Sequence, residues 1–195
     1  EMCIRDSPLE RLALLSDILF LDIETTGFLT GSSSIYLIGC AYYEDGNWKL
    51  RQWFAQTPDE ESEILSAFLA FAEPYSYLIH YNGNTFDLPF LRKKADKYGI
   101  SYTLSSKKGL DIFRRITPYK NFLKLPDCKL KTIEGFLGIH REDIYTGGQL
   151  IQVYHDYTSS HDYDLYHTLI LHNADDMKGM LETLPILSYL SLIHI

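Results

Sequence analysis

Apolar and polar positions along the chain alternate between short β-prone runs and longer patterns with helical spacing. Residues 18–24 form an apolar run that ends in acidic side chains and is interrupted by Thr25-Thr26-Gly27, which is typical of a central strand. Two later β-prone runs are separated only by Glu-Asp-Gly-Asn and predict a hairpin. The predicted strands cover residues 18–24, 35–43, 48–55, 77–81 and 110–112.

Helical patterns follow the first three strands and then alternate with the remaining two. Thr57-Pro58-Asp59-Glu60 predicts a helix start with Thr57 as N-cap and Glu60 closing a capping box. Further helices are predicted over residues 86–98, 129–137, 149–157 and 164–184, the last ending before Pro185. Three strands followed by alternating helices and strands indicate an α/β domain, with a mixed sheet flanked by helices.

Length and composition favour one ordinary globular domain. The chain has 195 residues, of which 46% are hydrophobic and 23% are charged. No apolar run approaches the ~18 residues that a membrane span needs, so no membrane partner is expected. Three cysteines without a pairing pattern favour a reducing compartment, and the expected location is the cytoplasm.

The two ends of the chain resemble translated sequencing adapter. Residues 2–7 and 190–195 back-translate into strings that are reverse complements of each other and resemble a transposase mosaic end. We therefore expect residues 1–7 and 190–195 to be non-native tails, with chance codon choice as the alternative. The expected single domain covers residues 8–189, cut at both ends, and a partner domain would be lost with the missing ends.

Charge is distributed very unevenly along the sequence. Residues 92–131 hold twelve Lys or Arg and three Asp, a net charge of +9; because the whole chain carries −8, the remainder carries −17. A local cluster of this kind suits a phosphate-binding surface on an acidic protein, and an ordinary solvated surface explains it equally well.

Three acidic motifs carry the candidate chemistry. Asp22 and Glu24 lie at i and i+2 on the first predicted strand, so they project to one face. Asp87 lies where the fourth strand gives way to a helix, where the alternative role is a helix N-cap. His172 and Asp176 lie at i and i+4 on the core-facing stripe of the last helix, where a structural hydrogen bond is the alternative. Clustered carboxylate oxygens suit Mg²⁺ or Mn²⁺.

Together the motifs resemble the Exo I, Exo II and Exo III signatures of the DEDD exonucleases, and in particular the YprB-like RNase H-like family. The matching stretches are residues 20–27, 81–91, 130–138 and 172–176, and the resemblance covers roughly residues 18–185. It implies an RNase H-like fold with a five-stranded mixed sheet whose second strand is antiparallel. It also implies 3′→5′ hydrolysis of single-stranded DNA or RNA with two divalent cations, Mg²⁺ or Mn²⁺.

The resemblance also assigns roles to the individual motif residues. Asp22, Glu24, Asp87 and Asp176 are the expected metal ligands, and His172 is expected to orient or deprotonate the attacking water. The DEDD pattern has His with four intervening residues before the last Asp, or Tyr with three; here His172 stands at the Tyr-like spacing. The residues expected to contact nucleic acid are Thr25, Asn82, Phe86, Arg92, Lys93, Lys94 and Lys97.

Other groups and functions remain as alternatives. His155, His161 and His167 lack a compact ligand motif, and we do not expect a zinc site there. Glu134 and Asp111 are either supporting groups of the metal site or, respectively, a surface helix charge and a strand-end acid. A catalytically silent nucleic-acid-binding module and a structure-specific endonuclease are the competing functions on this fold.

Overall fold

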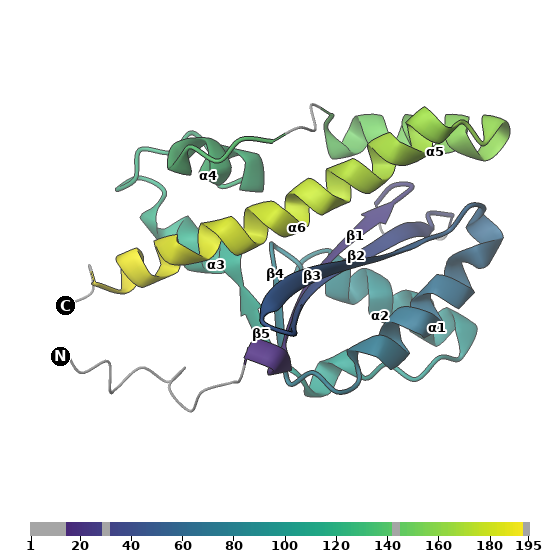
Figure 1. Cartoon of the computed structure of the whole chain (residues 1–195), viewed down its shortest axis with the longest axis horizontal. Helices are drawn as coiled ribbons and strands as arrows, with labels where there is room; N and C mark the ends of the chain where they lie inside the picture. Colours follow the sequence, from purple (N-terminus) through teal and green to yellow (C-terminus); the bar gives the residue numbers. More distant parts are fainter. Residues whose placement is uncertain (1–14, 29–31, 142–144, 193–195) are drawn as a thin grey trace.

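The computed structural model describes residues 15–28, 32–141 and 145–192, and forms three layers (Figure 1). One twisted sheet lies between two groups of helices. Its strands are β1 (Ile18–Thr25), β2 (Ile35–Glu44), β3 (Asn47–Phe54), β4 (Tyr77–His80) and β5 (Lys108–Asp111). The helices are α1 (Glu61–Ala72), α2 (Asp87–Tyr98), α3 (Ile112–Ile116), α4 (Leu130–Leu137), α5 (Gly147–Ser160) and α6 (Tyr163–Leu192).

The sheet has the strand order β3-β2-β1-β4-β5. Strand β2 runs antiparallel to both β1 and β3, whereas β1, β4 and β5 are parallel to one another. The predicted five-stranded mixed sheet with an antiparallel second strand is therefore confirmed. Short 3₁₀ turns cover Leu15–Asp17, Pro58–Glu60, Leu104–Ser106 and Thr117–Tyr119.

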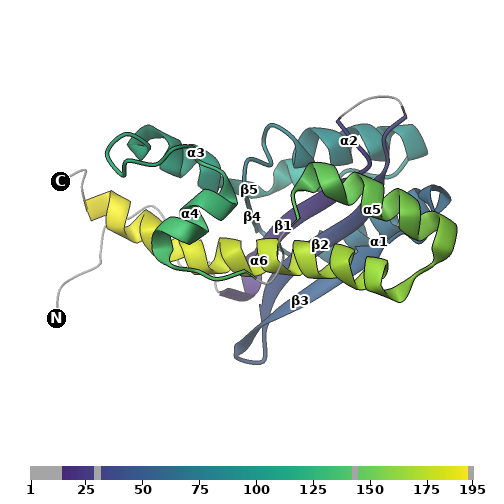
Figure 2. The same cartoon turned by 90° about the horizontal axis from the view of Figure 1, so that it is seen from above.

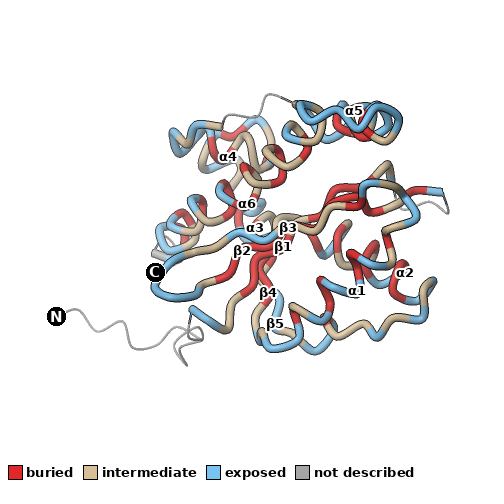
Figure 3. The backbone as a smooth tube through the Cα atoms, turned by 45° about the vertical axis from the view of Figure 1, so that its right-hand side comes forward, coloured by how far each residue is buried: buried red, intermediate tan, exposed pale blue. Residues whose placement is uncertain are grey.

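Side chains of β1 alternate between the two faces of the sheet, as the pleat requires. Leu19, Leu21 and Ile23 belong to the core cluster beneath helices α1 and α2. Phe20 belongs to the opposite cluster, which α3, α4 and the second half of α6 cover. A third, aromatic cluster joins β2 and β3 to α5 and the start of α6. Figure 2 shows α6 running across the sheet, and Figure 3 shows that buried residues are concentrated in the central strands.

Two sequence predictions about helix ends are wrong. The predicted capping box is wrong: Thr57 makes no side-chain cap bond, and the Glu60 carboxylate instead accepts from the N–H of Gln56. The last helix does not stop before Pro185 but continues to Leu192. Beyond Pro185, Ile186 and Leu190 are buried in the core, and this packing offsets the backbone hydrogen bond that proline cannot donate.

The predicted tails fall mostly outside the described residues. Residues 1–14 and 193–195 are not described, and residues 190–192 form the last turn of α6. Cys40 and Cys128 are free and buried. Within the described ranges, no helix combines the length and the apolar character needed to cross a membrane.

Candidate metal centre

Strand β1 presents Asp22 and Glu24 toward helix α6. The alternation that turns Leu21 and Ile23 into the core beneath α1 and α2 turns these two acids to the opposite face. Glu24 is 9% exposed, so its charge is removed from most of the solvent. The sequence prediction that Asp22 and Glu24 share a face is confirmed.

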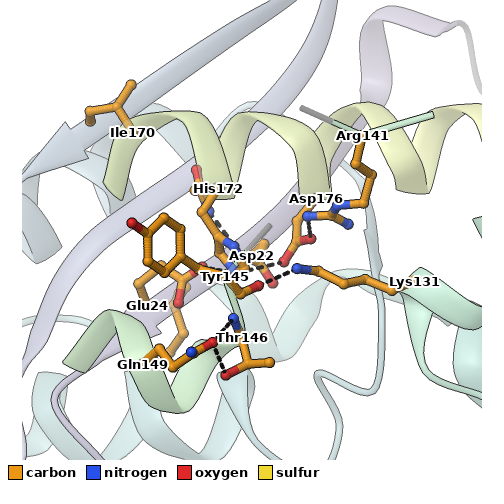
Figure 4. Close-up of polar contacts among 12 residues, drawn as sticks. Asp22, Glu24, Lys131, Arg141, Tyr145, Thr146, Gln149, Ile170, His172 and Asp176 are labelled. Atoms are coloured by element: carbon orange, nitrogen blue, oxygen red, sulfur yellow. Dashed lines mark hydrogen bonds and ion pairs between the residues drawn. The ribbon is translucent and has the colours of Figure 1, made fainter. Parts of the chain in front are cut away.

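Helix α6 brings His172 and Asp176 against this acidic face (Figure 4). The His172 Nε2 atom lies 3.6 Å from Glu24 Oε1 and also 3.6 Å from Asp176 Oδ2. One ligand atom from each of Glu24, His172 and Asp176 can be chosen so that all three lie within 4.8 Å of one another. Within the described residues this is the one group of three such side chains, and the three histidines at 155, 161 and 167 form none.

Asp87 joins the site from the start of helix α2. Pairing of β1 with β4 ends at Leu21 and His80, which leaves the N–H of Ile23 beyond the end of that shorter strand. Asp87 Oδ1 accepts this N–H at 3.1 Å, and the carboxylate is 5% exposed. Asp87 therefore bonds to the strand that carries Asp22 and Glu24, and the helix N-cap is Phe86 instead.

The four acids repel one another electrostatically. Burial raises the pKa of Asp22 well above its ordinary value, and repulsion from Glu24, Asp176 and Asp87 raises it further. Burial likewise raises the pKa of Asp87 to about 7, against the lowering effect of its backbone hydrogen bonds. Such a cluster is costly when ionised and uncompensated, and a divalent cation with oxygen ligands removes that cost. The donor set therefore fits the hard cations that this type of site implies.

Arg141 and Glu134 extend the site; the sequence analysis passed over Arg141 and left Glu134 open between a supporting group and a surface helix charge. Arg141 Nη1 donates to both Glu134 oxygens, at 3.0 and 2.9 Å, and Nη2 donates to Asp176 Oδ1. Glu134 is 1% exposed, so it is a buried partner and not a surface helix charge. Gly179 on α6 makes room for it, since a Cβ at 179 would lie 2.8 Å from Glu134 Cδ.

Asp111 supports the loop that carries the second motif. Its Oδ1 accepts the N–H of Asn82 at 2.9 Å and that of Arg114 at 3.3 Å, the latter at the start of α3. Asn82 has a left-handed φ of 60°, which Asn tolerates better than most residues. The Asp111 carboxylate therefore holds the turn between β4 and α2, and so the approach of Asp87 to the site.

The residues predicted to bind nucleic acid fall into three groups. Arg92, Lys93 and Lys97 are exposed on α2. The prediction for Lys94 is wrong: it is 3% exposed and its Nζ lies 3.0 Å from the buried Glu61 carboxylate and also donates to Ser33 O. Position 94 lies on the inner side of α2, where a charge is tolerated only with such a partner.

The uncharged members of that set are more enclosed. The Thr25 hydroxyl is 2.7 Å from the carbonyl oxygen of Gly27 and donates to it, and Phe86 is half-buried with its ring centroid 5.6 Å from that of Phe90. Phe28, which the sequence analysis passed over, is 84% exposed and follows directly after the Asp22-to-Gly27 motif. The sequence did contain a signal for Phe28, because it is an aromatic residue that directly follows an acidic motif at the end of a strand.

A mixed sheet in this order, with acids gathered on its central strand and on the helix that crosses it, defines an RNase H-like nuclease fold. The family model of the RNase_H superfamily matches residues 19–185, and the chain therefore belongs to that superfamily. No curated protein matches the chain.

Solved structures show the same fold at low sequence identity. The family B DNA polymerase of the archaeon Pyrobaculum calidifontis superposes with a TM-score of 0.66 and 17% identity, over 84% of this chain and 23% of that one. The zinc-bound E. coli exonuclease I–single-stranded DNA complex gives a TM-score of 0.50 and 16% identity, over 90% of this chain and 42% of that one. The chain thus spans less than half the length of either protein.

Proposed function

We propose that this protein is a metal-dependent 3′→5′ exonuclease of the DEDD type, in the YprB-like subgroup, acting on single-stranded nucleic acid. The observation that carries the proposal is the convergence of Asp22, Glu24, Asp87 and Asp176, which come from three separate motifs, with His172 beside Glu24 and Asp176. Exonuclease I, captured with single-stranded DNA, and the polymerase share the fold and support the assignment.

The four carboxylates would hold two divalent cations. In sites of this kind the cations stabilise the attacking and leaving oxygens of an in-line displacement at phosphorus. Asp22, at the centre of the acidic group, would contact both cations. Glu24 and Asp176 would complete one site, and Asp87 the other.

His172 would handle the proton of the attacking water. Its Nε2 atom points between Glu24 and Asp176, where it can accept a proton or orient the water. The Tyr-like spacing places His172 and Asp176 on one face of α6, which supports this role. Replacing His172 by Ala should slow cleavage by ~10²–10⁴-fold if the imidazole is the general base.

The substrate would run from this site along helix α2, which begins at Asp87. Arg92, Lys93 and Lys97 on α2 offer positive charge to the phosphate backbone. The exposed Phe28 and the half-buried Phe86 flank the acidic motifs in sequence and offer aromatic faces on which bases of any identity can stack. These contacts favour a single strand, whose bases are free to stack.

The test is digestion of single-stranded DNA and RNA oligonucleotides in Mn²⁺, each labelled at the 5′ or the 3′ end. We expect a 5′-labelled strand to give a ladder of shortened products, and Asp22→Asn to abolish it while the far-ultraviolet circular dichroism spectrum stays unchanged. Asp96→Asn on the exposed face of α2 is the matched control and should retain the ladder.

Other outcomes separate the competing functions. A single internal cut would show an endonuclease, and binding without cleavage would show a silent nucleic-acid-binding module. Either result would overturn the exonuclease assignment.

A further inference from the structure

One row of residues crosses three strands of the sheet beneath helix α6. Asp22 on β1 pairs in register with Gly39 on β2, and Gly39 pairs with Gln52 on β3. The middle position has no side chain, and the fully buried side chain of Asn173 from α6 occupies the space above it. A Cβ at position 39 would lie 2.7 Å from Asn173 Cγ and would push the amide out.

A chain of hydrogen bonds runs along this row and ends on a site carboxylate. Asn173 Nδ2 donates to Asp22 Oδ2 at 2.9 Å. Gln52 Nε2 donates at 2.9 Å both to Asn173 Oδ1 and to the backbone oxygen of Ile170.

These bonds fix which way round the Asn173 amide lies. The Asn173 oxygen accepts a hydrogen bond from the amino group of Gln52, so the amino group of Asn173 must face Asp22. A neutral donor in this place orients the Asp22 carboxylate and leaves its negative charge uncancelled. An arginine or lysine there would supply the same hydrogen bond and remove the charge that attracts cations.

We propose that Asn173 is a positioning residue that holds Asp22 in the orientation needed to bind cations. Gln52 fixes the orientation of the Asn173 amide, and Gly39 leaves the space that the amide occupies. This inference rests on the proposed function, since it assigns Asn173 a role toward the metal site. A simple packing contact between helix and sheet would need neither the fixed amide orientation nor a carboxylate at the end of the row of hydrogen bonds.

Three single variants in three different elements test the proposal by isothermal titration of the cation-free protein with Mn²⁺. Asn173→Leu keeps the branching of the side chain at Cγ and removes the donor, Gln52→Met removes the group that fixes the amide orientation, and Gly39→Ala displaces the amide. We expect Asn173→Leu and Gly39→Ala to weaken Mn²⁺ binding by ~10–100-fold, the range for groups that orient metal ligands. Gln52→Met should weaken it less, because Asn173 still reaches Asp22.

The matched control is Tyr154→Phe. It removes a buried hydrogen bond of 3.1 Å from α5 to the carbonyl oxygen of Ala55, next to the same sheet, without touching the site acids. We expect it to lower Tm and to leave Mn²⁺ affinity unchanged. The double variant Gln52→Met with Asn173→Leu should bind Mn²⁺ no more weakly than Asn173→Leu alone, because both act through one chain of bonds.

The outcomes separate this inference from the proposed function. If the wild-type protein binds Mn²⁺ and all three variants bind it equally well with only a lower Tm, Asn173 is a packing residue and the exonuclease proposal stands. Equal loss of affinity in Tyr154→Phe would also overturn the positioning role, since the effect would then be general. If the wild-type protein binds no Mn²⁺, both proposals fall. Should Asn173→Leu fail to fold, Gly39→Ala and Gln52→Met decide.

Discussion

Without a bound cation, the stability of this protein should fall as pH rises through the range in which Asp87 loses its proton. Asp87 is 5% exposed, and burial raises its pKa from 3.8 to about 7. Because the folded state holds a proton that the unfolded state releases, the free energy of unfolding decreases with pH between those two values. At 1.36 kcal/mol per pH unit, the ionised Asp87 costs the folded state about 4 kcal/mol as an upper bound.

The assay is urea unfolding in EDTA at intervals from pH 4.5 to pH 8, followed by circular dichroism. We expect the free energy of unfolding to drop over this interval and to level off above about pH 7. Asp87→Asn should reduce this dependence, because an amide does not titrate. A residual slope should remain, since burial and the neighbouring acids also raise the pKa of Asp22.

The control is Asp96→Asn, which changes an exposed carboxylate on the same helix and should leave the pH dependence unaltered. Saturating Mn²⁺ at pH 8 should restore the stability of the wild-type protein, since a ligand that binds only the folded state stabilises it. Cation-free stability that rises from pH 5 to pH 8, or an Asp87→Asn variant with the wild-type slope, would refute the electrostatic account of the site.

The remaining predictions concern charges around the site. Arg141→Ala should lower the free energy of unfolding by ~3–5 kcal/mol in urea titrations, because it leaves the buried Glu134 without the guanidinium nitrogen that donates to both of its oxygens; a loss below ~1 kcal/mol would mean that Glu134 is compensated elsewhere. Lys94→Met should destabilise the protein by less than Arg141→Ala does, because the buried Glu61 loses its nearest cation but keeps the Ile35 N–H, the Tyr98 hydroxyl and Lys97 at 3.8 Å, and it should leave the salt dependence of oligonucleotide binding unchanged. Replacing both Arg92 and Lys93 by Glu should do the reverse, weakening binding and flattening its dependence on salt with little change in stability; an unchanged salt dependence would return these side chains to an ordinary solvated surface.

The sheet could be predicted from sequence because its information is local. Apolar runs mark the strands, and the two-residue period alone places Asp22 and Glu24 on one face. The burial of Lys94 could not be predicted in this way, because its partner Glu61 lies 33 positions earlier on another helix. From sequence alone, a lysine that follows Asp87 on an amphipathic helix is predicted to be a surface charge. Only the packing of α1 against α2 shows that it is buried.

The helix that passes through Pro185 and the pair of Arg141 with Asp176 were missed for the same physical reason. Proline disfavours helix locally by removing one hydrogen bond, and only the burial of Ile186 and Leu190 against the rest of the core outweighs that cost. The contact of Arg141 with Asp176 spans 35 positions and depends on Gly179 leaving room for Glu134. Sequence patterns show which face of an element is apolar, and they do not show which element will cover it.

The donors around the acidic cluster explain how a costly site can be built without losing its attraction for cations. Asp22, Asp87 and Asp176 each have one carboxylate oxygen held by a donor from a different part of the fold. These donors are the amide of Asn173, the backbone N–H of Ile23 and the guanidinium of Arg141. Two of the three donors are neutral, and the charge of the third is shared with Glu134, so the carboxylates are oriented while most of their mutual repulsion remains. A bound cation would relieve this repulsion, and the relief would contribute to its binding free energy. Metal affinity therefore depends on how α6 packs on the sheet.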